Sequence, residues 1–70
     1  MLKIGVYEHY KGNQYELLYI AKHSETLEEM AVYKALYDNG TIWVRPLSMW
    51  NEDVIMNGKT VPRFKYIGKR

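Results

Sequence analysis

The segment Thr41-Ile42-Trp43-Val44 constrains the fold of this chain more than any other part of the sequence. Its β-branched and aromatic residues follow one another without a break, and such residues favour a β-strand. An isolated strand is not stable, so this segment needs a partner. Met30 to Tyr37 can provide that partner across a turn at Asp38-Asn39-Gly40. The sequence therefore predicts a β-hairpin that ends at Arg45.

A helix is the competing interpretation of the stretch before this turn. Leu27, Met30, Ala31 and Ala35 recur at helical spacing, and Asn39-Gly40 is a typical helix-ending signal. We favour the strand, because a helix would leave the β segment that follows without a partner.

A three-residue turn would divide the side chains of this hairpin between two faces. It places Leu36 opposite Ile42, Ala35 opposite Trp43, and Tyr33 opposite Arg45. One face is aliphatic apart from Lys34 and is expected to form the core: Val32, Leu36, Ile42, Val44 and Pro46. The other face is expected to turn its rings and its cation towards solvent: Tyr33, Ala35, Tyr37, Trp43 and Arg45.

Two strands precede this hairpin. The first is predicted from Leu2 to Tyr10, with Leu2, Ile4 and Val6 alternating onto one face. The second is predicted from Tyr15 to His23. Lys11-Gly12-Asn13 separates them, either by a tight Gly-Asn turn or by a three-residue loop.

The chain after Arg45 is expected to add one more strand. Pro46 should end the preceding strand, because proline cannot donate to a ladder. Leu47 to Trp50 is expected to form one tight turn, and Asn51 to Gly58 a loop. Thr60 to Ile67 is the last strand, which Pro62 marks as an edge or a strand start. Short strands joined by tight turns predict an all-β fold, a small five-stranded barrel.

Length and composition limit the remaining alternatives. Seventy residues form a single domain, residues 1–70, and without cysteine the domain depends on packing, which an aromatic share of 14% supports. No apolar run reaches the about 20 residues that span a bilayer, and no signal-peptide pattern opens the chain. We expect a soluble, cytoplasmic protein without membrane contact. The net charge of +2 allows phosphate binding without requiring it, and a basic C-terminal group is expected to be solvated: Lys59, Arg63, Lys65, Lys69 and Arg70.

Arg45 is the strongest candidate for ligand recognition. A guanidinium can hold a carboxylate or phosphate through two parallel hydrogen bonds, and it can stack on a ring. Tyr33 and Trp43 share its expected face, so a planar ligand could stack beside a fixed cation. The competing interpretation is an internal salt bridge from Arg45 to Glu25 or Glu52.

The two histidines and the residues after His23 are the other candidates. His9 and His23 lie at or near predicted strand ends, and histidine can act as a base, a ligand or a pH sensor. Two histidines without a third ligand make a poor zinc site, so no metal is expected. His23, Ser24 and Glu25 combine a base, a nucleophile and an acid, but neighbours on an extended chain point apart. The competing interpretation is that Ser24 or Thr26 caps a turn, and the capping-box spacing of Thr26 and Glu29 predicts that one short helical turn starts there.

Five stretches in order along the chain resemble the short bacterial proteins of domain-of-unknown-function family 1653. They are Tyr7-Glu8-His9-Tyr10-Lys11-Gly12-Asn13, Ala21-Lys22-His23-Ser24-Glu25-Thr26, Val32-Tyr33-Lys34-Ala35-Leu36-Tyr37, Trp43-Val44-Arg45-Pro46 and Pro62-Arg63-Phe64. The resemblance implies an SH3-like β-barrel and no established activity, because that family is uncharacterised.

The function expected from these residues is that of a small binding module. Its ligand site would be a polar, aromatic groove, and the proposed residues are His9, His23, Ser24, Tyr33, Trp43 and Arg45. The expected partner is a nucleotide, a nucleic acid or an acidic peptide, with no cofactor. Two alternatives stay open: a small hydrolase that uses His23 and Glu25, and a domain that docks its aromatic face on another protein.

Overall fold

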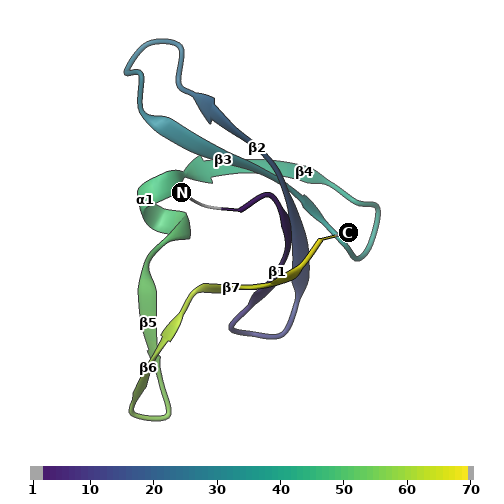
Figure 1. The fold of residues 1–70 in the computed structure, drawn as a ribbon, viewed down its shortest axis with the longest axis vertical. Helices are drawn as coiled ribbons and strands as arrows, with labels where there is room; N and C mark the ends of the chain where they lie inside the picture. Colours follow the sequence, from purple (N-terminus) through teal and green to yellow (C-terminus); the bar gives the residue numbers. More distant parts are fainter. Residues whose placement is uncertain (1–2, 70) are drawn as a thin grey trace.

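Seven β-strands and one helical turn follow one another along the chain, which confirms the predicted all-β class (Figure 1). The computed structural model describes residues 3–69. The elements are β1 (Gly5–His9), β2 (Gln14–Lys22), β3 (Glu29–Ala35), β4 (Ile42–Pro46), α1 (Leu47–Trp50), β5 (Asp53–Met56), β6 (Lys59–Pro62) and β7 (Phe64–Gly68).

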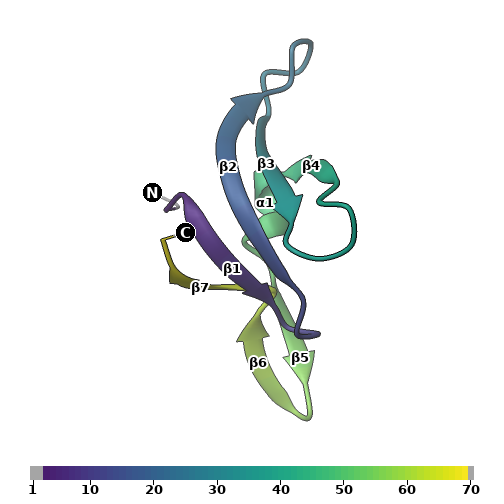
Figure 2. The ribbon, with the colours of Figure 1, turned by 90° about the vertical axis from the view of Figure 1, so that its right-hand side faces the viewer.

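Five of the strands form one antiparallel sheet in the order β4-β3-β2-β1-β7, and β5 pairs only with β6. The large sheet curves strongly, as Figure 2 shows from the side. Its ladders leave β4 and β7 as the two edges of the sheet within residues 3–69. The first strand was predicted to start at Leu2, which lies outside the described residues, as does Arg70 of the basic group.

The strand prediction for the β3 segment is confirmed, and the competing helix is wrong. β3 pairs with β4, and Tyr33 lies opposite Trp43 while Ala31 lies opposite Arg45. The turn is longer than the predicted three residues, so the register is displaced by two. An even displacement leaves each side chain on its predicted face. Tyr33, Trp43 and Arg45 therefore still share one side of the hairpin.

The prediction of which face is buried is wrong. Tyr33 and Ala35 are only 5% and 4% exposed, whereas Ile42 and Val44 on the supposed core face are 59% and 60% exposed. The first strand shows the same inversion, because Tyr7 is buried while Ile4 is exposed. The concave side of the sheet is filled by rings, and the β-branched side chains lie on its convex side.

Aromatic side chains from distant parts of the chain form the core. Trp50 of α1 stacks on Phe64 of β7 with ring centroids 3.8 Å apart and planes 5° from parallel. Tyr7 and Tyr33 pack edge-on against Trp50, at centroid distances of 5.3 and 4.9 Å. Tyr19 of β2 lies outside this cluster, because its side chain is exposed on the convex side. One small helical turn thus closes the open side of the sheet.

The β5–β6 hairpin was not predicted. Asn57 and Gly58, with φ of 53° and 77°, form its tight turn, and Met56 pairs with Lys59. The segment expected to be one strand from Thr60 to Ile67 is divided at Arg63 into β6 and β7. The backbone of Arg63 donates to Glu52 and accepts from Tyr10 (2.9 and 3.0 Å), which fixes the hairpin at its base. No helix in residues 3–69 has the length and apolar character to cross a membrane.

Candidate functional site

Three of the predicted site residues line one pocket on the concave side of the sheet. Tyr33 of β3 and Trp43 and Arg45 of β4 surround a space of about 240 Å³, together with Tyr15 and Tyr37. They meet because odd-numbered positions of β3 and β4 share a face and Tyr33 pairs with Trp43. We refer to these five residues as the tyrosine–arginine pocket.

Arg45 is fixed by rings and a hydroxyl group. Its Nε donates to the hydroxyl oxygen of Tyr33 at 3.0 Å. Its guanidinium carbon lies 5.7 Å from the ring centroid of Tyr33 and 5.4 Å from that of Phe64. Contacts of this kind hold the planar group in one orientation at a half-buried position.

The internal salt bridge weighed for Arg45 is not formed. Glu52, one of its expected partners, pairs with Arg63 at 3.5 Å, and no ion pair joins Arg45 to a carboxylate in residues 3–69. Over the same residues, no hydrogen bond is seen from the two terminal nitrogens of Arg45. A guanidinium carries four N–H donors on these nitrogens, in the fork that binds an anion through two parallel bonds.

Tyr15 and Tyr37 add a second polar element to the pocket. Their hydroxyl oxygens are 2.6 Å apart, and either hydroxyl can be the donor. Burial, with the hydrogen bond to Tyr37, raises the pKa of Tyr15 to about 12. The hydroxyl of Tyr15 therefore keeps its proton near neutral pH, and in a hydrogen bond between two hydroxyls the accepting one has its own O–H left for a ligand. The pocket thus presents donors and aromatic faces, which match an anionic, acceptor-rich group.

Trp43 supplies the accessible ring at the mouth of this pocket. Its side chain is 51% exposed, although Tyr33 beside it is buried. The expectation that Trp43 is accessible therefore holds, whereas Arg45 is half-buried and the expectation that Tyr33 faces solvent is wrong. Tyr33 contacts Arg45 through its ring and its hydroxyl, and its ring face is not open to solvent.

His9 lies on the same side of the sheet but belongs to a neighbouring pocket. Its ring centroid is 5.0 Å from that of Phe64 and 6.3 Å from that of Tyr15. Its Nδ1 accepts the backbone N–H of Lys11 at 3.2 Å, which leaves Nε2 as the protonated nitrogen of the neutral ring. Burial lowers the pKa of His9, and the nearby cations Arg63, Arg45 and Lys11 lower it further.

The neighbouring pocket has a volume of about 450 Å³ and lies between the β1–β2 turn and the β5–β6 hairpin. Apolar side chains of Met56, Val61 and Pro62 form one part of its wall, with His9 and Tyr10 in another. The charged lining groups, Glu8 and Lys65, lie opposite each other on β1 and β7. These opposite charges offer no single preference for the sign of a ligand.

His23 and Ser24 do not join the site. They lie at the tip of the β2–β3 hairpin, at the opposite end of β2 from Tyr15 (Figure 1). A rise of about 3.3 Å per residue puts His23 roughly 25 Å from Tyr15 along the strand. The predicted strand from Tyr15 to His23 had this length, but the residue pattern did not show that the pocket forms at the Tyr15 end of the strand.

The side chain of His23 instead stabilises its own turn. Its Nδ1 accepts the backbone N–H of Glu25 at 3.1 Å and that of Thr26 at 3.4 Å. Thr26 acts in the same way, because its hydroxyl accepts the backbone N–H of Glu28 at 3.2 Å. This confirms a capping role for Thr26, without the helix that its spacing suggested.

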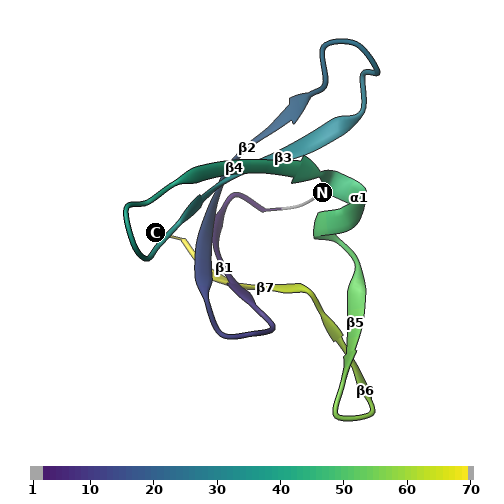
Figure 3. The ribbon, with the colours of Figure 1, turned by 180° about the vertical axis from the view of Figure 1, so that it is seen from behind.

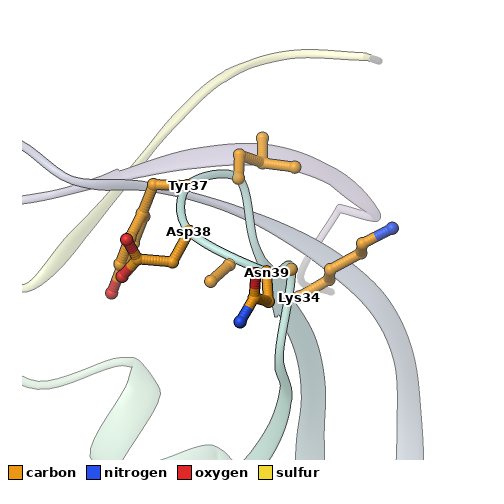
Figure 4. A pocket seen from close by; sticks show the side chains of 7 residues that line it. Lys34, Tyr37, Asp38 and Asn39 are labelled. Atoms are coloured by element: carbon orange, nitrogen blue, oxygen red, sulfur yellow. The ribbon is translucent and has the colours of Figure 1, made fainter.

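A third pocket, of about 440 Å³, is framed by the β3–β4 turn alone and is lined by residues 34–40. Figure 4 shows the ammonium group of Lys34 pointing away from Tyr37 and Asp38. Its polar groups therefore do not converge on one point. In residues 3–69, no cluster of three or more histidine, aspartate or glutamate side chains is arranged to hold a metal ion.

Tyr15, Tyr37 and Phe64 are parts of the site that sequence reasoning did not include. Tyr37 was on the predicted aromatic face together with Tyr33, Trp43 and Arg45. This shared face was the signal that could have placed Tyr37 among the predicted site residues. Tyr15 lies opposite Ala35, and this small residue leaves room for the ring. Phe64 had no local signal, because β7 reaches the site only through the fold.

Family models confirm the resemblance noted in the sequence. Residues 5–66 match the model of DUF1653, a family described as proteins of unknown function. The chain belongs to DUF1653. Among solved structures, it is similar to the crystal structure of a DUF1653 protein from Bordetella bronchiseptica, with 39% identity and a TM-score of 0.90. That match covers 99% of this chain and 91% of the Bordetella protein. No match was found among curated proteins.

Proposed function

We propose that this DUF1653 protein is a small binding module whose tyrosine–arginine pocket holds an anionic group of a nucleotide, a nucleic acid or an acidic peptide. The observation that carries the proposal is the half-buried Arg45 guanidinium, oriented by Tyr33 and without a carboxylate partner in residues 3–69. A desolvated cation without a counter-charge costs free energy, and a bound anion recovers it.

The aromatic wall of the pocket supports a flat ligand beside that anion. Trp43 exposes its ring at the mouth, and the hydroxyl pair of Tyr15 and Tyr37 offers one donor. A volume of about 240 Å³ is smaller than most drug-sized sites, which begin near 300 Å³. The pocket therefore suits one side chain or one nucleotide unit of a longer ligand.

Two further expectations belong to this proposal. An SH3-like barrel is supported by a curved five-stranded sheet whose two edge strands approach each other through Arg45 of β4 and Phe64 of β7. A cytoplasmic location is consistent with a chain that contains no cysteine. The hydrolase alternative has less support, because the Nδ1 of His23 is occupied by backbone donors and cannot donate to a carboxylate.

The test is an amide chemical-shift titration of the labelled protein with adenosine monophosphate, short single-stranded DNA or RNA, and a glutamate-containing peptide. We expect at least one of these ligands to shift the Arg45 Nε–H and the Trp43 indole N–H. Arg45→Gln should weaken that ligand about 10-fold or more, the usual loss for a hydrogen-bonded charge.

Lys65→Gln is the matched control for this substitution. It removes the same charge from the exposed side of β7, so its effect should stay within about 2-fold, as for a surface charge. Arg45→Lys should bind more weakly than the parent protein, because lysine keeps the charge and loses the fork. Equal losses for Arg45→Gln and Lys65→Gln, or no shifts with any probe, would contradict the proposal.

A further inference from the structure

Within the described part of the chain, one edge of β4 presents a row of backbone groups that pairs with no other strand. β4 is the outer strand of the order β4-β3-β2-β1-β7, and Figure 3 shows no other element in front of it. The N–H of Ala35 donates to the carbonyl of Thr41 at 3.0 Å, so residues 35 and 41 form a hydrogen-bonded pair. Such pairs alternate in an antiparallel ladder. The N–H and C=O groups of Ile42 and Val44 therefore point away from β3, along the free edge.

The side chains of this edge do not protect it. Ile42, Trp43 and Val44 are 59%, 51% and 60% exposed, and they are apolar on both faces. Native edge strands usually carry lysine, proline or a bulge that discourages further pairing. The opposite edge has such features, because β7 contains Lys65 and its pairing with β1 is interrupted by a bulge. In β4, only the terminal Pro46 is of this kind.

The charge of Arg45 indicates what kind of strand would pair here. An added antiparallel strand would place one residue directly opposite Arg45, with their Cβ atoms about 5 Å apart on the concave side. A carboxylate at that position would face the free fork of Arg45, which no carboxylate occupies within residues 3–69. The residues opposite Ile42 and Val44 would lie on the convex side, where apolar side chains match.

The surroundings of Arg45 favour a peptide over a nucleic acid. Arg45 is the one cation that lines the pocket. Lys34 faces the convex side opposite Ile42, and Lys65 alternates with the buried Phe64 on β7, so its side chain is exposed on the other face of that strand. Tight binding of a nucleic acid depends on several phosphate contacts, each made by its own cation.

We propose that β4 binds an extended acidic peptide by strand addition. Read from its N-terminus, the antiparallel peptide has an acidic residue opposite Arg45 and then an apolar residue opposite Val44. Any residue can follow opposite Trp43, and an apolar residue comes next opposite Ile42. This inference rests on the proposed function, since it assigns the anion at Arg45 to a peptide side chain. Backbone pairing supplies the affinity, and alternate side chains supply the selectivity.

The test uses the acetylated and amidated peptide Thr-Glu-Val-Thr-Val-Thr and two N-methylated versions of it. Methylation of both valines removes the N–H groups that would bond to Ile42 and Val44. It should weaken binding about 10-fold or more, because two hydrogen bonds are lost. Methylation of the central threonine is the matched control, since that N–H points away from β4, and it should change the affinity less than about 3-fold. Amide hydrogen exchange at Ile42 and Val44 should slow about 10-fold in the complex with the unmodified peptide.

The other outcomes separate this inference from the proposed function. Equal binding of the two N-methylated peptides would overturn strand addition, while a loss caused by Glu→Gln in the peptide would still support an anion at Arg45. Binding of adenosine monophosphate or single-stranded RNA at Trp43 and Arg45, with no response to the peptide, would keep the proposed function and overturn this inference. Sedimentation could show a dimer in the absence of peptide. If hydrogen exchange then shows that the amides of Ile42 and Val44 are protected in this dimer, the edge binds a second copy of the chain and this inference is overturned. No response to any probe would overturn both.

Discussion

Trp50 joins parts of the molecule that are far apart in the sequence. It is 1% exposed and stacks on Phe64 while touching the rings of Tyr7 and Tyr33. Its indole N–H is buried and has no hydrogen-bond partner in residues 3–69. The same side chain therefore gives the core its largest ring and leaves one polar group unsatisfied.

Replacement of Trp50 should show these two effects separately. Trp50→Ala should lower the free energy of unfolding by about 3–5 kcal/mol, as expected for a large buried ring. Trp50→Phe should cost less than half of that, because it also removes a buried donor whose desolvation costs about 1–3 kcal/mol. Urea unfolding followed by circular dichroism gives both values.

Met49→Ala in the same helical turn is the control for Trp50. Met49 is exposed, so its change should stay within about 0.5 kcal/mol. A loss for Trp50→Phe as large as that for Trp50→Ala would mean that the indole N–H is hydrogen-bonded in solution.

At the scale of elements, two glycines with positive φ differ in their surroundings. At Gly58, in the β5–β6 turn, a Cβ would meet open space. At Gly5, which begins β1 with a φ of 148°, a Cβ would lie 2.7 Å from the carbonyl oxygen of Gly68 in β7. The approach of β1 to β7 therefore depends on the missing side chain at Gly5.

Alanine at these two positions should destabilise the protein to different degrees. Gly58→Ala should cost about 1 kcal/mol, from the unfavourable backbone conformation alone. Gly5→Ala should cost more than about 2 kcal/mol, because overpacking adds about 1–3 kcal/mol to that conformational cost. Thermal and urea unfolding of both variants measure the difference. Similar losses would show that β7 moves away from β1 at little cost.

The order and type of most elements could be predicted from the sequence. The β propensity of Thr41 to Val44 was enough to decide β3 in favour of a strand, because a lone strand has no stability. The sharing of one face by Tyr33, Trp43 and Arg45 was also predictable, since an even shift of register preserves it. The β5–β6 hairpin was predictable too, because Asn57-Gly58 is a strong two-residue turn signal that the prediction overlooked.

The buried face of the sheet could not be predicted from the hairpin alone. Both faces are largely apolar, and the aliphatic face was the more hydrophobic choice by residue type. Trp50 and Phe64 determine which face is buried, because they pack against Tyr33. Both residues lie after the hairpin in the chain. The separation of His23 from Arg45 likewise follows from three-dimensional placement, which a pattern of residue types does not contain.

For the whole molecule, the titrating groups of the aromatic core set a pH range of highest stability. Burial and neighbouring cations lower the pKa of His9 below its usual 6.5. Burial raises the pKa of Tyr15 to about 12 from 10.0, and burial also raises that of Tyr7. The folded state therefore disfavours the charged forms of all three groups.

The direction of each pKa shift determines how the stability of the protein changes with pH. Unfolding releases the imidazole of His9 to bind a proton below pH 6.5, so stability should fall as the pH drops from 6.5 towards the folded-state pKa of His9. The phenols bind protons more tightly in the folded state, so stability should fall between pH 10.0 and about 12. Urea midpoints across this range should reach a plateau between the two limits.

Two substitutions test the assignment of these limits. His9→Gln should reduce the loss of stability at acid pH without changing the loss at alkaline pH, and Tyr15→Phe should do the reverse. If the loss of stability at acid pH is unchanged in His9→Gln, groups other than His9 control stability in that pH range.

The two tryptophans of this chain occupy opposite environments, with Trp50 at 1% and Trp43 at 51% exposure. Indole emission shifts to longer wavelength in water, so one emission spectrum contains a blue component from the core and a red component from the pocket mouth. A bound ligand should quench the red component while the blue one stays constant, and denaturant should shift the blue one. The protein therefore carries its own optical reporters for ligand occupancy and for integrity of the fold, without any added dye.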